Sequence, residues 1–183
     1  ALMSMIGSQA LSENIQQLHI EEPHKILEQL HYEVTRILKQ KETNTNDGMD
    51  IALVALDKNP QGQFTRLRFA GAKNSLLYLH NGELRELKAD RKSIGGRMPA
   101  NATEHTFTCH EIVLNEPFTG YLFSDGYRDQ MGGPNNRKFG SAQLRDLLSE
   151  IYTLPMAKQK DLMNKIIEEW LGSNRQIDDI LVI

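Results

Sequence analysis

Three aspartates beside apolar segments are the residues of this sequence best placed to do chemistry. Asp125 comes just after the apolar run 120–123 and precedes a glycine, so a buried strand would present its carboxylate at the edge of a sheet. Asp178 and Asp179 stand directly before a second apolar run, residues 180–183. If the two runs are antiparallel neighbours, all three carboxylates meet at one edge.

Carboxylates gathered without neighbouring lysine or arginine repel one another and favour protonation unless a cation neutralises them. Oxygen donors of this kind select hard divalent cations such as Mg²⁺ and Mn²⁺. Each pattern also has a plainer explanation: an Asp-Gly turn after an ordinary strand, and a solvated strand start. The spacing therefore leaves two interpretations, a divalent-metal site at Asp125, Asp178 and Asp179 or unconnected strand ends.

Helices are predicted at both ends of the chain. Apolar residues at helical spacing predict one helix over residues 2–18 and a second over residues 23–39. Ser141 is expected to cap a third helix. A fourth is expected between Pro155 and Gly172, where glycine is a typical helix stop.

The middle of the chain has the periodicity of strands. Residues 50–57 are largely apolar and predict a strand buried on both faces, whereas residues 65–70 alternate and predict a half-exposed strand. Asn81 and Gly82 tolerate positive φ and predict a hairpin turn. Other strands are expected at 76–79, 84–87, 105–114, 120–123 and 177–183, with loops at 90–104 and 130–138. The strands between residues 50 and 87 are expected to form a meander of antiparallel strands.

Composition places the chain among soluble globular proteins. Its 183 residues suit one domain, 1–183, with ordinary contents of 39% hydrophobic and 25% charged residues. A net charge of -3 and a pI near 6.1 give no basic field, so nucleic acid is not an expected partner. The apolar runs are too short to span a membrane and no signal peptide is visible, so a cytoplasmic location is expected.

The single cysteine and the histidines are not expected to do chemistry. Cys109 excludes an intrachain disulfide, and its strand-like surroundings predict a small buried hydrophobe rather than a nucleophile. The six histidines are scattered, without a His-x-x-x-His pair. None is assigned to metal binding or acid–base work.

Five spaced motifs resemble the SpoIIE-type branch of the bacterial metal-dependent serine/threonine protein phosphatases, members of the PPM superfamily that are similar to protein phosphatase 2C. The resemblance covers essentially the whole chain, in the expected order. The motifs are residues 47–53, 69–74, 122–126 with 129–130, 138–140 and 176–183. Five motifs in order are far more specific than one Asp-Gly pair.

The resemblance implies an α+β fold, a layered α/β/β/α sandwich of two antiparallel sheets flanked by helix pairs, with a binuclear Mn²⁺ or Mg²⁺ centre. It implies hydrolysis of phosphoserine or phosphothreonine on a regulatory protein, often a STAS-type anti-sigma-factor antagonist, by a metal-activated water. By motif position Asp125 and Asp178 match the catalytic, metal-binding carboxylates. Asp179 stands where relatives carry Asp or Asn and ranks second, and Asp47 and Asp50 receive no firm metal role.

The chain departs from the family pattern at its start. The family's remaining metal acids lie in a Gly-Asp strand motif and an Asp-x-x-Gly-His-Gly turn, which runs into a helix resembling residues 1–7. We therefore expect the first strands and about half of the metal ligands to be missing here, with weak metal binding and impaired activity. An upstream sensor or receiver domain is also expected in the full-length protein.

Two other functions stay open at this point. One is a catalytically inactive, phosphatase-like module that binds a protein in a signalling pathway. The other is an α/β interaction domain whose acids are solvated strand ends.

Overall fold

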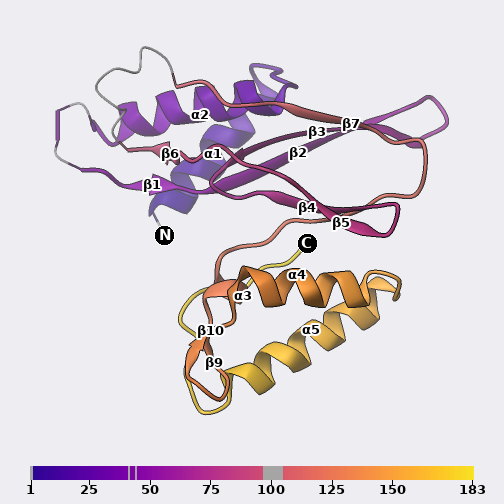
Figure 1. The fold of residues 1–183 in the computed structure, drawn as a ribbon. Helices are drawn as coiled ribbons and strands as arrows, with labels where there is room; N and C mark the ends of the chain where they lie inside the picture. Colours follow the sequence, from indigo (N-terminus) through magenta and orange to yellow (C-terminus); the bar gives the residue numbers. More distant parts are fainter. Residues whose placement is uncertain (1, 41, 44, 97–104) are drawn as a thin grey trace. The chain divides into compact units, whose positions relative to one another are not determined.

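The computed structural model describes residues 2–40, 42–43, 45–96 and 105–183. Its backbone divides into two compact units (Figure 1). Unit 1 comprises residues 1–76 and 87–117, and unit 2 comprises residues 77–86 and 118–183. Each unit packs helices against a three-stranded sheet, which confirms the expected mixture of helices and antiparallel strands.

In unit 1, the apolar side chains of the helices and of the sheet pack into one core. Its elements are α1 Leu2–Gln16, α2 Pro23–Ile37, β1 Gly48–Met49, β2 Ile51–Lys58, β3 Phe64–Ala72, β6 Ile94–Gly95 and β7 His110–Val113. One sheet has the order β2-β3-β7, and β1 pairs with β6. The inward stripe of α2, with Leu27, Leu30 and Val34, shares a core with Ala70 and Ala72 of β3.

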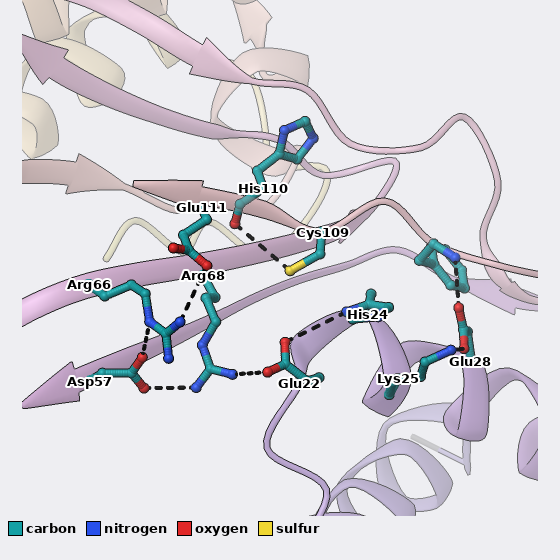
Figure 2. Close-up of polar contacts among 11 residues, drawn as sticks. Glu22, His24, Lys25, Glu28, Asp57, Arg66, Arg68, Cys109, His110 and Glu111 are labelled. Carbon is teal, nitrogen blue, oxygen red and sulfur yellow. Dashed lines mark hydrogen bonds and ion pairs between the residues drawn. The ribbon is translucent and has the colours of Figure 1, made fainter. Parts of the chain in front are cut away.

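Arg68 corrects the expectation that β3 is half exposed. β3 is the middle strand of its sheet, and Arg68 is only 5% exposed. Its guanidinium lies between two carboxylates: Nη2 is 2.7 Å from Asp57 Oδ1, and Nη1 is paired with Glu22 (Figure 2). The alternating pattern placed an arginine on the second face of the strand, but two acids from other elements cover it there.

β2 is not buried on both faces as its apolar run predicts. Most of its residues are half buried, and Leu56 is 45% exposed. The reason is its place at the edge of the β2-β3-β7 sheet, where its side chains have strand neighbours on one side only. A continuous apolar run does not by itself distinguish a central strand from an edge strand.

The predicted strand 105–114 is shorter, and Cys109 is exposed rather than buried. The strand β7 begins at His110 because the residues before it bond to side chains: the Asp90 carboxylate accepts the N–H of Thr108 at 2.7 Å and its hydroxyl at 3.2 Å. The predicted loop 90–104 contains β6, and its residues 97–104 lie outside the described residues.

Unit 2 contains the predicted hairpin and the second helix pair. Its elements are β4 Leu76–His80, β5 Glu83–Leu87, β8 Thr119–Tyr121, α3 Gly126–Asp129, β9 Met131–Gly132, β10 Arg137–Lys138, α4 Gly140–Ile151 and α5 Met156–Leu171. The sheet order is β5-β4-β8, and β9 and β10 form a short ladder within the predicted loop 130–138. Asn81 and Gly82 have φ of 52° and 77°, which confirms the hairpin turn.

Ser141 does not cap α4, contrary to the sequence prediction. The helix begins at Gly140, and the residue before it, Phe139, makes no side-chain cap. The entry into α4 is fixed by packing instead, because the buried Phe139 ring meets Tyr127 and Trp170 edge to face at 5.2 and 5.3 Å.

The segment 177–183 is not the buried strand that its apolar residues predict. It makes one antiparallel bridge, between Val182 and Phe123. Ile177 and Ile183 are 56% and 71% exposed. At the start of this segment, a side chain rather than a neighbouring strand accepts a backbone hydrogen bond: Asp178 Oδ1 accepts the N–H of Asp179 at 2.8 Å.

The buried His31 predicts that stability falls in weak acid. Its Nδ1 accepts the N–H of Gly95 at 3.0 Å, and its ring stacks on His105 with 3.6 Å between centroids. Burial, then the charges of His105 and Lys92, lower the pKa of His31 from 6.5 to about 4. Between these values the unfolded chain binds a proton that the folded chain does not. The free energy of unfolding should therefore be highest above pH 6.5 and fall by about 3 kcal/mol as pH drops to 4.

Urea denaturation at a series of pH values between 7.5 and 4 measures this loss. His31→Gln should reduce the pH dependence and leave the part due to His105, whose pKa burial also lowers, and His80→Gln, which changes an exposed histidine of the hairpin, should leave it as it is. An equal slope in the native chain and His31→Gln would show that another group is responsible.

Candidate functional site

The two apolar runs beside the aspartates are antiparallel neighbours in unit 2, as the sequence predicts. Phe123 bridges Val182. The N–H of Leu122 donates to the carbonyl of Ile183 at 2.9 Å, and the N–H of Ile183 donates back at 2.8 Å. The backbone thus brings residue 125 and residues 178–179 to the same edge.

Ser124 and Gly126, on either side of Asp125, hold the second acidic segment in place. The Ser124 hydroxyl donates to the carbonyl of Asp179 at 2.7 Å and accepts the N–H of Leu181 at 3.0 Å. A Cβ on Gly126 would lie 2.4 Å from that same Asp179 carbonyl oxygen, so only glycine fits this approach. The sequence prediction missed both roles.

Gln130 is a further positioning residue that sequence reasoning missed. It follows α3 and is 1% exposed. Its side-chain amide donates to the carbonyl of Arg175 at 3.1 Å, and its Oε1 accepts the N–H of Ile177 at 3.4 Å. The chain that leads into Asp178 is therefore fixed to the residue that follows α3.

The three carboxylates differ in exposure and do not share one point. Asp125 is half buried and makes no capping bond to α3, whereas Asp178 and Asp179 are exposed. Among the described residues, the one group of three potential metal ligands with all donor atoms within 4.8 Å of one another lies in unit 1 and contains none of them. Their donor type and their common edge suit a hard divalent cation, but the side chains would have to rotate to share it.

Neighbouring acids of the sequence motifs are engaged elsewhere. Asp129 of α3 is paired with Lys138, whose Nζ lies 2.9 Å from Oδ2. In unit 1, Asp50 accepts the hydroxyl of Ser93 at 2.9 Å and lies 3.8 Å from Lys73 Nζ, as expected for an acid that braces the start of a strand.

A family model described as Stage II sporulation protein E (SpoIIE) matches residues 1–183. The chain belongs to the SpoIIE family. It is thus a phosphatase domain of the SpoIIE/PP2C type. A comparison with curated protein sequences gives no match.

Solved structures agree with this assignment. The SiaA-PP2C domain of Pseudomonas aeruginosa is 30% identical to the SpoIIE-family chain, with a TM-score of 0.80 over 100% of this chain and 68% of that one. The serine/threonine phosphatase of S. agalactiae is 15% identical, with a TM-score of 0.60 over 99% and 78%. A structure from the bacterial stressosome is 18% identical, with a TM-score of 0.58 over 100% and 74%. The last two show the fold alone.

No described helix of the SpoIIE-family chain has the length and apolar character needed to cross a bilayer.

Proposed function

We propose that residues 1–183 act as one SpoIIE-type domain that removes phosphate from phosphoserine or phosphothreonine of a regulatory protein with the help of Mn²⁺ or Mg²⁺. One observation carries the proposal. In a chain that the SpoIIE family matches from end to end, the antiparallel bridge between Phe123 and Val182 brings the backbone of residue 125 and of residues 178–179 to the same edge. After rotation of their side chains, carboxylates at one edge suit a hard divalent cation, which supports the proposal.

In this proposal Asp125 and Asp178 hold the metal, and Asp179 is a weaker third ligand. A bound divalent ion would supply charge neutralisation for the phosphoryl group and an activated water. Ser124 and Gly126 keep the 178–179 backbone against the segment around residue 125, so the side chains of all three aspartates start from one edge. Asp125 lacks a cap bond to α3, which leaves its oxygens available to a cation.

A signalling protein is the proposed substrate. The structural relatives include the SiaA-PP2C domain and a structure from the stressosome, a system described as controlling secondary messenger signalling. We extend this to a phosphorylated regulatory partner, such as a STAS-type anti-sigma-factor antagonist, and to a sensor or receiver domain that controls the phosphatase.

The first test is the metal dependence of hydrolysis of an aryl phosphate. With Mn²⁺ we expect a rate at least about tenfold above that with a chelator, because the metal supplies the activated water. Three carboxylates are few for two ions, so residues 1–183 should be slow. An N-terminally extended chain that carries the family's Gly-Asp and Asp-x-x-Gly-His-Gly motifs should be faster. Equal rates of the two chains would contradict the need for further ligands.

One observation favours a second function, an inactive module that binds a protein. The carboxylates of Asp125, Asp178 and Asp179 are not in the one described group whose ligand atoms lie within 4.8 Å of one another. If neither chain hydrolyses an aryl phosphate or a phosphoserine protein at saturating Mn²⁺, the phosphatase proposal fails and the binding module stands.

A further inference from the structure

Unit 1 brings together a carboxylate, an imidazole and a thiol. Ligand atoms of Glu22, His24 and Cys109 all lie within 4.8 Å of one another. Glu22 directly precedes α2, His24 lies in the first turn of α2, and Cys109 directly precedes β7 (Figure 2). Sequence analysis assigned no such role to Cys109 or to the histidines, because His24 and Cys109 lie 85 residues apart in the chain.

We propose that Glu22, His24 and Cys109 form a binding site for a single zinc-class transition-metal ion, separate from the aspartate edge of unit 2. The donor set decides the class of metal. Thiolate and imidazole favour Zn²⁺ and related ions over Mg²⁺ and Mn²⁺, which prefer oxygen ligands alone.

The imidazole is the donor best prepared to bind. His24 Nδ1 is inaccessible to solvent and has no hydrogen-bond partner among the described residues. An unpartnered buried nitrogen is costly unless something binds it. The Oε2 atom of Glu22 lies 4.0 Å from this nitrogen. A metal ion between these two atoms would satisfy both.

Arg68 orients the carboxylate. It is buried, is held by Asp57 on one side at 2.7 Å, and is paired with Glu22 Oε1 on the other. This leaves Glu22 Oε2 on the side of His24. A charged group that fixes one oxygen of a ligating carboxylate and leaves the other for the metal is a common second layer of a metal site.

Small movements suffice to complete the site. Bonds of about 2.3 Å to sulfur and about 2.0 Å to nitrogen and oxygen place tetrahedral ligands about 3.5 Å apart. Cys109 is exposed, so rotation of its side chain can shorten the present separations while Glu22 keeps its contact with Arg68. Three protein ligands leave a fourth position for water. The ion would join the first turn of α2 to the start of β7.

The thiol must give up a proton to bind. Removal of its sulfur from water, and then the Glu22 carboxylate, raise the pKa of Cys109. The thiol is therefore protonated in the metal-free chain, and the ion displaces that proton when the metal–sulfur bond forms.

Co²⁺ titration of the chelator-treated, reduced chain tests the site, because thiolate bound to Co²⁺ gives a charge-transfer absorption band. We expect one Co²⁺ per chain, displaced by Zn²⁺. Since Cys109 is the only cysteine, the band also identifies the ligand. No band, or two chains per ion, would overturn the proposal.

Variants separate this site from the aspartate edge. Cys109→Ser should abolish the band, and His24→Gln should weaken Zn²⁺ affinity at least tenfold, each with an unchanged circular dichroism spectrum. The matched control His80→Gln should bind Zn²⁺ like the native chain, and the edge variant Asp125→Asn should keep the full Co²⁺–thiolate band, because that band reports on Cys109 alone. If Cys109→Ser and His24→Gln bind Zn²⁺ as tightly as the native chain, the ion binds elsewhere and the proposal is wrong.

Discussion

Replacement of Asp125 by asparagine is expected to lower the Mn²⁺-dependent rate of phosphate ester hydrolysis at least about 100-fold while the domain stays folded. Mutation of residues that only hydrogen-bond to metal ligands lowers metal affinity or activity about 10- to 100-fold. Loss of a charged ligand should therefore lower activity at least as much. Stability should not change greatly, because the Asp125 side chain makes no capping bond to α3.

Asp178→Asn should have an effect of the same size for the same reason. The Asp178→Asn variant should fold like the native chain. Asp178 Oδ1 accepts the N–H of Asp179, and the Oδ1 of an asparagine can accept the same hydrogen bond. Each variant removes one negative charge and almost no volume, so a lower rate reports on the charge.

The measurement is kcat/KM for an aryl phosphate over a series of Mn²⁺ concentrations, in residues 1–183 and in the extended chain. Asp161→Asn, the same change on an exposed position of α5, is the matched control and should keep the native rate. Retention of full activity by both Asp125→Asn and Asp178→Asn would remove these carboxylates from the metal site.

The parts of the fold that the sequence predicts well are those with a local cause. The stripe of α2, the Asn81-Gly82 turn and the stop of α5 at Gly172 each depend on residues within a few positions of one another. For these, spacing alone carries the physical information.

The errors come from contacts between distant residues. The alternation in residues 65–70 placed Arg68 on the exposed face of a strand. Nothing in that strand reveals that Glu22, 46 residues away in sequence, covers the arginine. Cys109 was expected to be buried within a strand, since the sequence does not reveal the bonds between Thr108 and Asp90, 18 residues away, that precede the start of β7 at His110. Periodicity indicates which side chains share a face, but it does not reveal what covers that face.

In the candidate site too, the sequence predicts the contact that follows from a local pattern and misses the contacts between distant residues. The pattern of acids beside apolar runs predicts that residue 125 and residues 178–179 are neighbours. It does not predict Ser124, whose hydroxyl reaches a carbonyl 55 residues away, or Gln130, whose amide reaches Arg175. Both are polar residues in short connecting stretches, where many such contacts are possible and the sequence does not select one.

Gly126→Ala is expected to detach the C-terminal segment from the Phe123 run and to lower the free energy of unfolding by about 1–3 kcal/mol. The added Cβ would lie 2.4 Å from the carbonyl oxygen of Asp179 and 2.9 Å from its carbonyl carbon. Both are backbone atoms, so the clash cannot be relieved by turning a side chain. The segment 178–183 must move as a whole.

Hydrogen exchange measures the detachment directly. The N–H of Ile183 and the N–H of Leu181 are bonded to the Leu122 carbonyl and the Ser124 hydroxyl, and both should lose protection in Gly126→Ala. Gly7→Ala is the matched control within α1, because the nearest atoms to its Cβ belong to the flexible Met49 side chain, at 3.0 Å and beyond.

Whether Gly126→Ala raises or lowers the free energy of unfolding shows whether helix propensity or tertiary packing determines the effect of this substitution. Alanine is favoured over glycine in a helix interior by about 1 kcal/mol, so local preference predicts that Gly7→Ala stabilises α1 and gives no reason for Gly126→Ala, at the first residue of α3, to destabilise the domain. We expect stabilisation only for Gly7→Ala. If Gly126→Ala is as stable as the native chain and keeps its protected amides, close backbone packing does not hold Asp178 and Asp179 beside Asp125. If it destabilises as expected and also lowers phosphatase activity, the backbone contact at Gly126 is what positions the proposed metal ligands.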